Sequence, residues 1–419
     1  MANLASTYRN QGRWKEAEKL EVQVMETRKR VLGQEHPSTL TSMANLASTY
    51  QNQGRWKEAE ELEVQVMETR KRVLGQEHPS TLTSMANLAS TYRNQGRWKE
   101  AEELEVQVME TSSRVLGQEH PDTLTSMANL ASTYRNQGRW KEAEELQAQE
   151  LEICKRVLGQ EHPDTLTSMA NLASTYRNQG RWKEAEKLEV QVMETRKRVL
   201  GQEHPSTLTS MANLASTYQN QGRWKEAEEL EVQVMETSSR VLGQEHPDTL
   251  TSMANLASTY RNQGRWKEAE ELQAQELEIC KRVLGQEHPD TLTSMANLAS
   301  TYRNQGRWKE AEELEVQVME TSSRVLGQEY PSTLTSMANL ASTYQNQGRW
   351  KEAEELQAQE LEICKRVLGQ EHPDTLTSMA NLASTYRNQG RWKEAEELEV
   401  QVMETRKRVL GQEHPDMLT

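Results

Sequence analysis

The residues able to do chemistry recur at a fixed period, but their spacing does not suit catalysis. One histidine appears in nine copies, as at His36, and Tyr330 replaces it once. Each of these histidines lacks a second ligand at the short spacing of a zinc site. Its place just before a proline indicates a loop or helix-capping role. We therefore predict no metal site and no cofactor.

The cysteines and hydroxyl residues also lack catalytic partners. Ser90 and Thr91 have no adjacent base, and no phosphate-binding glycine motif is present, so we predict that the protein is not an enzyme. Stacked helices stand about 8–10 Å apart, so cysteines two or more repeats apart exceed the ~7 Å Cα limit of a disulfide. Free, buried thiols favour a reducing, cytoplasmic location. The three thiols are those of Cys154, Cys280 and Cys364.

These residues recur because the chain consists of ten near-identical copies of a 42-residue sequence, which begin at methionines from Met1 to Met379. A period of 20 to 50 residues is typical of a solenoid, in which each repeat packs only on its neighbours. We predict a single solenoid over residues 1–419, with its first and last A helices incomplete. Its repeats are 1–42, 43–84, 85–126, 127–168, 169–210, 211–252, 253–294, 295–336, 337–378 and 379–419.

Each repeat contains two apolar patterns with the period of an amphipathic helix. We predict that helix A begins at Pro79, with Ser80, or Asp in other copies, as its N-cap, and stops at Gly96. Helix B is predicted from about Trp98 to Leu116, where a second glycine follows. The predicted apolar stripe of helix B is Trp98, Ala101, Leu104, Val108 and Val115.

Helix B occurs in three variants. The residues at the positions of Arg70 and Lys71 are Arg-Lys in repeats 1, 2, 5 and 10, and Ser-Ser in repeats 3, 6 and 8. Repeats 4, 7 and 9 read QAQELEICKR and are called Ile-Cys repeats here; Glu150, Glu276 and Glu360 replace a stripe valine in them. Burying an unpaired carboxylate is costly, so we predict that helix B turns its contact face there. Each Ser-Ser repeat precedes an Ile-Cys repeat, which indicates that pairs were duplicated together.

Two helices joined by a glycine-containing turn resemble the tetratricopeptide repeat. The 42-residue length and the segments NLASTYRNQGRWKEAE and RVLGQEHP resemble the kinesin light chain type. This resemblance implies an all-α fold, a right-handed superhelical solenoid of antiparallel helix-turn-helix repeats. Glu63 stands where the family has a bulky apolar residue, so we predict either that Leu62 takes over the packing or that the position is wetter. The matching residues of repeat 2 are Leu46, Ala47, Tyr50, Gly54, Trp56 and Ala59.

The resemblance places the second stripe of helix A on a concave groove. Its Asn, Ser and Arg side chains can hydrogen-bond a peptide backbone or a carboxylate. We predict a non-catalytic protein-interaction scaffold that binds extended peptide segments, including acidic ones, although Gln51, Gln219 and Gln345 interrupt the arginines. The alternative is a structural or idealised array without a ligand. The predicted peptide-binding residues are Asn45, Asn87, Asn129, Asn171, Asn213, Asn255, Asn297, Asn339, Ser90, Ser132, Ser174, Arg93, Arg135, Arg177, Arg261 and Arg303.

Charge and the terminal repeats bear on other partners. The net charge of −14 is spread over all repeats, which argues against nucleic acid, because nucleic acid requires clustered Lys and Arg. No segment has the apolar length of a membrane span. The terminal repeats lack a neighbour on one side, so we predict exposed apolar side chains and head-to-tail self-association. These side chains are Leu4, Ala5 and Tyr8 at one end, and Trp392, Leu398 and Val402 at the other.

Overall fold

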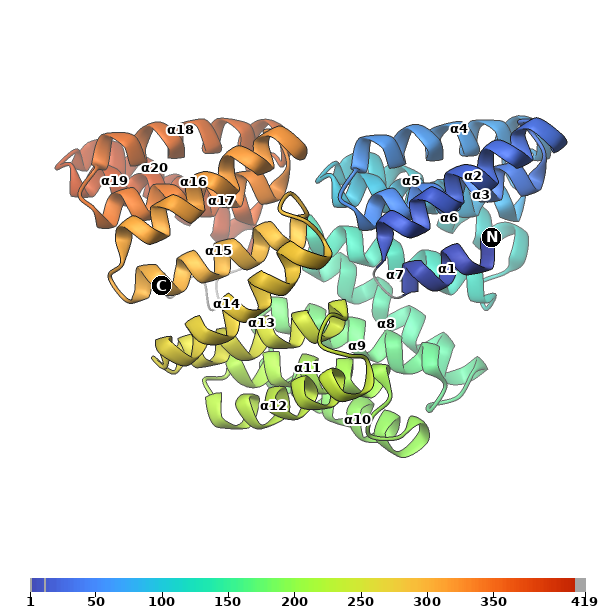
Figure 1. Cartoon of the computed structure of the whole chain (residues 1–419), viewed down its shortest axis with the longest axis horizontal. Coiled ribbons are helices and arrows are strands. Elements are labelled where there is room, and N and C mark those ends of the chain that lie inside the picture. The colour runs from blue at the N-terminus through green and yellow to red at the C-terminus, as the bar shows by residue number, and fades with distance from the viewer. Residues whose placement is uncertain (1, 11–12, 411–419) are drawn as a thin grey trace. The chain divides into compact units, whose positions relative to one another are not determined.

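The computed structural model describes residues 2–10 and 13–410, and all regular secondary structure in these residues is α-helical (Figure 1). A 16-residue helix A that begins at proline alternates with a helix B of 18 or 19 residues that begins at tryptophan. None of the described helices combines the length and apolar composition of a membrane span. The predicted all-α repeat fold is confirmed.

The chain divides into two compact units, Met1–Thr175 and Tyr176–Thr419, and the division falls inside helix α9 (Pro163–Asn178). A single solenoid through all ten repeats therefore stays a prediction. In the first unit, helices α1 to α8 pack consecutively against one another. Their bounds are α1 Ala2–Asn10, α2 Trp14–Leu32, α3 Pro37–Asn52, α4 Trp56–Leu74, α5 Pro79–Asn94, α6 Trp98–Leu116, α7 Pro121–Asn136 and α8 Trp140–Val157.

In the second unit, helices α10 to α20 also pack consecutively. Odd-numbered helices are A helices in both units, and even-numbered helices are B helices. The bounds are α10 Trp182–Leu200, α11 Pro205–Asn220, α12 Trp224–Val241, α13 Pro247–Asn262, α14 Trp266–Val283, α15 Pro289–Asn304, α16 Trp308–Val325, α17 Pro331–Asn346, α18 Trp350–Val367, α19 Pro373–Asn388 and α20 Trp392–Leu410.

A histidine caps helix A, instead of the predicted Ser or Asp. In α5 the N-cap is His78, and its Nδ1 accepts a hydrogen bond from the Ser80 backbone N–H at 3.1 Å. Pro79 takes the first helical position, where its missing N–H leaves no broken bond. Ser80 therefore lies inside the first turn, so the predicted cap residue was wrong. The capping role predicted for the histidine is confirmed.

This cap should contribute measurably to stability. His120 Nδ1 accepts from the Asp122 backbone N–H at 3.1 Å, and an N-cap lost to alanine typically costs about 1 kcal/mol. We expect His120→Ala to lower the free energy of unfolding by about that amount in urea denaturation followed by circular dichroism. His120→Asn, which supplies another good cap, should restore most of the loss. An equal loss in both variants would argue against capping.

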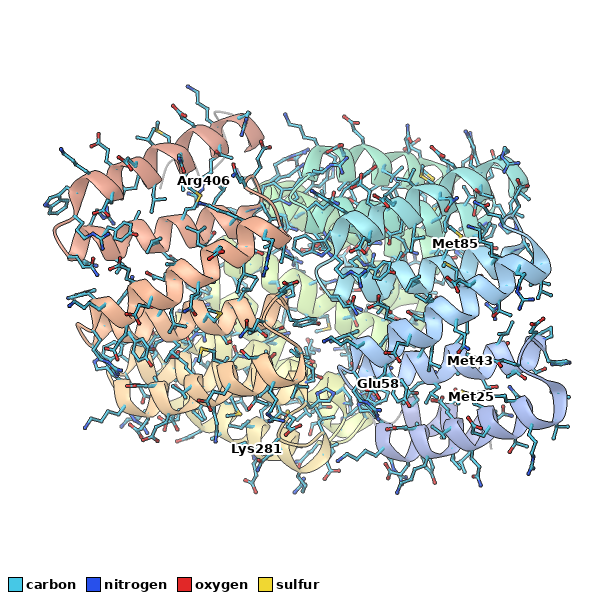
Figure 2. The ribbon with its side chains drawn as sticks, turned by 90° about the horizontal axis from the view of Figure 1, so that it is seen from above. Met25, Met43, Glu58, Met85, Lys281 and Arg406 are labelled. Carbon is cyan, nitrogen blue, oxygen red and sulfur yellow. The ribbon has the colours of Figure 1, made fainter. Side chains whose placement is uncertain are left out.

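The packing residues of each repeat match the prediction except near the end of helix B. Leu82, Met85 and Leu88 of α5 are buried, and methionines such as Met25 and Met43 pack between neighbouring helices (Figure 2). Val115 is 44% exposed, so its predicted place in the stripe was wrong. Ser112 is buried instead, because the inward positions of α6 are Ala101, Glu105, Val108 and Ser112, spaced three or four residues apart.

Glu63 is dry, so the prediction of a wetter position was wrong. The residue is only 4% exposed. Its carboxylate accepts hydrogen bonds from Thr91 Oγ1 of the next helix A at 2.5 Å and from Gln51 Nε2 at 3.0 Å. Burial raises the pKa of Glu63 to about 7. Leu62 packs against the adjacent core cluster, but it lies beside the glutamate and does not replace it.

The Ile-Cys repeats keep the same buried face, so the predicted turn of helix B was wrong. The buried positions of α8 include all four of α6, and Leu151 is buried in addition. Instead, the buried acid moves by one helical turn: Gln147 takes the position of Glu105, and Glu150 takes that of Val108. In α14, the Glu276 carboxylate accepts a hydrogen bond from Ser294 Oγ at 2.5 Å, and burial raises its pKa to about 7.

The terminal repeats expose some of the predicted apolar side chains. Leu4 is 47% exposed and Trp392 is 67% exposed. The expected exposure of Ala5 and Val402 was wrong, since Ala5 is buried in a repeat where α1 packs on α2, and Val402 belongs to the core cluster of the last helix pair. Tyr8 and Leu398 are half-buried. Self-association through these ends stays a prediction.

Candidate functional site

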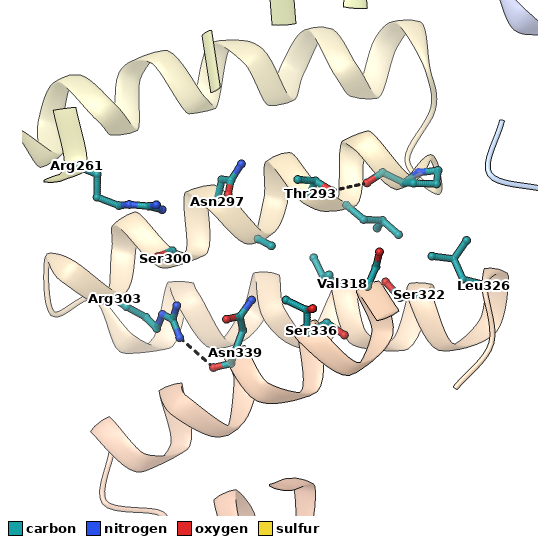
Figure 3. A pocket seen from close by; sticks show the side chains of 15 residues that line it. Arg261, Thr293, Asn297, Ser300, Arg303, Val318, Ser322, Leu326, Ser336 and Asn339 are labelled. Carbon is teal, nitrogen blue, oxygen red and sulfur yellow. Dashed lines mark hydrogen bonds between the residues drawn. The ribbon is translucent and has the colours of Figure 1, made fainter. Parts of the chain in front are cut away.

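The predicted asparagines remain accessible on the A face, the surface formed by the A helices in each unit. Between pairs of A helices this face carries hollows. In the second unit, a hollow of about 290 Å³ lies between α15 and α17 and is floored by α16 (Figure 3). A similar hollow of about 250 Å³ lies between α11 and α13 over α12. We call these two sites A-face hollows.

Both A-face hollows lie over Ser-Ser repeats, and the variant residue explains them. In repeat 2, Arg70 Nη1 reaches across to the next A helix and donates to the Ser80 carbonyl at 3.0 Å and to Ser84 Oγ at 2.9 Å. Arg196 of repeat 5 makes the equivalent bonds. The equivalent residue in α16 is Ser322, whose short side chain leaves that volume open. The sequence contained this signal as the Ser-Ser variant, but its consequence was not predicted.

The larger hollow brings together four predicted residues from three A helices: Arg261, Asn297, Arg303 and Asn339. Figure 3 shows the two arginines at one end of the hollow, with the asparagines beside them. The same close-up places an apolar and hydroxyl floor, which sequence reasoning missed, at the other end. Val318, Ser322 and Leu326 of α16 and Ser336 of α17 lie at that end. Thr335 of α17 also lines the hollow.

The side chain of Arg303 is fixed by contacts with the two helices that follow it, α16 and α17. Its Nη1 donates to the Asn339 carbonyl at 3.2 Å, and its Nε lies 3.5 Å from the buried carboxylate of Glu315. Arg93 and Arg177 are held in the same way. Arg93 bonds the Asn129 carbonyl and pairs with Glu105, and Arg177 bonds the Asn213 carbonyl and pairs with Glu189. These predicted arginines therefore also join successive A helices.

Arg261 differs, because its own repeat is an Ile-Cys repeat. Gln273 stands where a glutamate pairs with the arginine in other repeats, and its Oε1 accepts a hydrogen bond from Thr301 instead. Among the described residues, the guanidinium of Arg261 donates one hydrogen bond, a long one of 3.5 Å to Ser258 Oγ. Burial lowers the pKa of Arg261 and the nearby Arg303 lowers it further, and no carboxylate of the described residues opposes this shift.

The remaining predicted residues are not gathered at one place. Asn213 and Asn255 line the smaller A-face hollow. The glutamines that interrupt the arginines tie repeats together, since Gln51 and Gln219 each donate to a threonine hydroxyl of the next A helix at 2.6 Å. The other predicted peptide-binding residues lie on the A helices of the first unit, outside these two hollows. They are Asn45, Asn87, Asn129, Asn171, Ser90, Ser132, Ser174, Arg93 and Arg135.

The described residues offer little support for catalysis. Within residues 2–10 and 13–410, no group of three His, Cys, Asp or Glu side chains is arranged to hold a metal ion. Burial raises the pKa of the Cys154 thiol to about 11, which disfavours the thiolate that a nucleophile requires. The chemistry available on the A face is hydrogen bonding and charge pairing.

Comparison with solved structures gives several similar folds. Two crystal structures of the nearly identical TPR-like repeats of a Podosopora anserina kinesin light chain are 38% and 40% identical to this chain. They cover 50% and 49% of it and 99% and 98% of their own chains, with TM-scores of 0.43 and 0.42. A Rap protein complexed with competence and sporulation factor is 10% identical, covers 88% of this chain and 98% of its own, and has a TM-score of 0.57. No curated protein sequence matches the chain.

Sequence models of the tetratricopeptide repeat match most of the chain. One matches residues 122–198, 248–324, 297–357 and 332–408, and a second matches residues 1–38, 39–80, 81–122 and 207–248. Repeats of this kind are typically non-enzymatic scaffolds for protein interactions. The helix pairs, the accessible face of the A helices and these matches agree: the chain belongs to the tetratricopeptide repeat family.

Proposed function

We propose that this protein is an interaction scaffold whose A-face hollows bind extended peptide segments, with an acidic side chain of the peptide placed on Arg261. The observation that carries the proposal is the state of this guanidinium, which is half-buried beside a second arginine without the carboxylate that other repeats provide. A charge buried in this way is costly unless it is paired. A carboxylate from a ligand would supply the missing partner.

The walls of the larger A-face hollow suit an extended backbone. The amides of Asn297 and Asn339 can each donate to and accept from a peptide group, and both remain partly accessible. Their positions are equivalent in successive repeats, so they can contact successive parts of one extended chain. The apolar floor around Val318 and Leu326 gives room for one side chain. Arg261 and Arg303 mark the end at which the peptide's acid is expected.

Fluorescence anisotropy with labelled peptides tests this proposal. The probes are heptapeptides of Gly, Ser and Asn that carry no charge, one central Glu or one central Lys. We expect the Glu peptide to bind most tightly, and Arg261→Gln to raise its Kd about tenfold or more, since a hydrogen bond to a charged group is worth about 1.5–3 kcal/mol. Ser322→Arg should abolish binding at this hollow, because arginine fills the equivalent space in repeat 2.

Arg177→Gln is the matched control, because Arg177 already pairs with Glu189 at 3.5 Å. It should change the Kd of the Glu peptide less than twofold. If the Glu and uncharged peptides bind alike, or if Arg261→Gln has no effect, the acidic-peptide proposal is wrong. Binding of none of the probes would instead favour the alternative of an array without a peptide ligand.

A further inference from the structure

A different hollow lies between B helices, away from the groove residues discussed above. In the first unit it has a volume of about 610 Å³ and separates α6 from α8 over the start of α7. We call it the B-face hollow. Its lining is mostly apolar, and it includes Met109 and Ser113 from α6, Met127 from α7, and Leu146, Ala148, Glu152 and Ile153 from α8.

The B-face hollow results from the step between a Ser-Ser repeat and an Ile-Cys repeat. At the equivalent step between repeats 1 and 2, the corresponding residues are Lys29, Val64 and Thr69. Ser113 is shorter than that lysine and Ala148 is smaller than that valine, so both exchanges remove atoms. Ile153 replaces threonine and makes the wall more apolar. The ordered pairing of the two variants thus shortens the side chains at this step and makes its surface more apolar than between two Arg-Lys repeats.

The same arrangement occurs at each of the three Ser-Ser to Ile-Cys steps in the described residues. In the first unit, Met109 and Ile153 flank a core of Leu124, Met127 and Cys154. The second unit contains two clusters of equivalent composition. One has Met235 and Ile279 beside Leu250, Met253 and Cys280, and the other has Met319 and Ile363 beside Leu334, Met337 and Cys364.

The rim of the B-face hollow is acidic. A Ser-Ser helix has lost the two cations that an Arg-Lys helix carries at these positions. Glu152 lines the hollow and is exposed. Glu110 is exposed and directly follows the lining residue Met109 in α6, and neither glutamate forms an ion pair with the described residues. Two of the cations that remain are already compensated: Arg114 pairs with Glu77 at 2.8 Å, and Arg156 pairs with Glu119 at 2.7 Å. Helix α8 also keeps Lys155, at the position of Ser113.

We propose that the B-face hollow is a docking site for a partner segment that presents a bulky aliphatic side chain flanked by Lys or Arg. The aliphatic side chain would enter between Met109 and Ile153, where flexible thioethers can adapt to its shape. The flanking cations would pair with Glu110 and Glu152. Apolar anchors that fill a pocket supply most of the binding energy at such surfaces, and complementary charge supplies selectivity. This site therefore selects the charge opposite to that selected at Arg261.

The first test uses two synthetic peptides, acetyl-Lys-Lys-Leu-Lys-Lys-amide and its Leu→Ala version, with the full chain labelled with ¹³C at the methionine methyls. We expect the Leu peptide to shift the methyl signals of Met109, Met235 and Met319, and the Ala peptide to bind at least tenfold more weakly. The peptide acetyl-Glu-Glu-Leu-Glu-Glu-amide should cause no shift. Equal effects of the Leu and Ala peptides would overturn the proposal. So would Met109 shifts that depend on protein concentration without peptide, because these would indicate a second copy of the chain.

The chain itself supplies the variants. Ser113→Lys, Ser239→Lys and Ser323→Lys together restore the residue of the Arg-Lys repeats, which is tolerated at Lys29 and Lys71. This triple variant should lose the shifts and raise the Kd at least tenfold. Conversely, Lys71→Ser, Val106→Ala and Thr111→Ile should create a new hollow between repeats 2 and 3 and make the Met67 methyl respond. Unchanged binding in the first variant, or no response of Met67 in the second, would contradict the proposal.

Discussion

The free energy of unfolding should fall as the pH rises from about 4.5 to about 7. Burial raises the pKa of Glu63, Glu189, Glu231 and Glu315 from an ordinary value of 4.5 to about 7. The folded chain therefore holds protons that the unfolded chain releases in this window. Their stabilisation is complete below the unfolded pKa and is lost as the pH passes through the folded pKa. Each carboxyl changes stability by about 1.4 kcal/mol per pH unit, or about 3 kcal/mol over the window.

The surroundings of these buried glutamates explain why their pKa values are raised. The Glu231 carboxyl accepts one hydrogen bond, on Oε1 from Gln219 at 2.6 Å, whereas its Oε2 has no partner among the described residues. Glu228 on the same helix raises the pKa of Glu231 further, and no cation of the described residues lowers it. In repeat 3, by contrast, Arg93 lies 3.5 Å from Glu105 and opposes the rise, although burial still dominates.

Urea denaturation at pH 5 and at pH 8 measures this effect, and the chain contains a matched variant. Repeat 9 has glutamine at both Gln345 and Gln357, and the hydroxyl of Thr385 donates to Gln357 Oε1 at 2.6 Å. Glu63→Gln gives repeat 2 the same pair. It should raise the free energy of unfolding at pH 8 by about 2–3 kcal/mol and change it little at pH 5.

Glu58→Gln is a control that should change the free energy of unfolding at pH 8 in the opposite direction. Arg55 lowers the pKa of the half-exposed Glu58 through their ion pair, so losing that carboxylate should cost a little stability at pH 8. An exposed pair of this kind contributes less than about 1 kcal/mol. Greater stability at pH 8 than at pH 5 would mean that the buried acids are ionised and paired in the folded chain.

The helices could be predicted because their signals are local. Proline marks the start of helix A, and a glycine follows the end of each helix within two residues. Gly96 and Gly117 have φ angles of 76° and 96°, which L side chains rarely adopt. The apolar spacing of Leu82, Met85 and Leu88 likewise determines which face of helix A is inward. These features need no knowledge of neighbouring repeats.

The burial of Glu63 and the state of Arg261 could not be predicted, because both depend on other helices. Glu63 is accepted inside because a threonine of the next repeat donates to it. Arg261 lacks a carboxylate because Gln273, on the following helix, bonds a threonine one repeat further on. The A-face hollow at Ser322 similarly needs α15, α16 and α17 together. The sequence showed which residues vary, but only packing shows which volume each variant fills or empties.

A second buried acid in one helix B should be severely destabilising. Val234 of α12 is buried one helical turn after Glu231, and it occupies the position at which Ile-Cys repeats carry glutamate. Val234→Glu alone places two carboxyl groups on the same buried face, where both desolvation and mutual repulsion oppose ionisation. We expect a loss of about 3 kcal/mol or more at pH 8 and a smaller loss at pH 5, where both groups are neutral.

The double variant Glu231→Gln with Val234→Glu keeps one buried acid but moves it by one helical turn. It therefore tests whether the number of buried acids or their position determines stability. It gives repeat 6 the arrangement of repeat 9, in which Gln345 and Gln357 accompany Glu360 and the hydroxyl of Ser378 donates to that carboxyl at 2.5 Å. Ser252 is the equivalent hydroxyl. If each helix B tolerates one buried acid at either position, urea denaturation should place the double variant within about 1 kcal/mol of the parent. A double variant as unstable as Val234→Glu would mean that the isoleucine and cysteine of those repeats are also required.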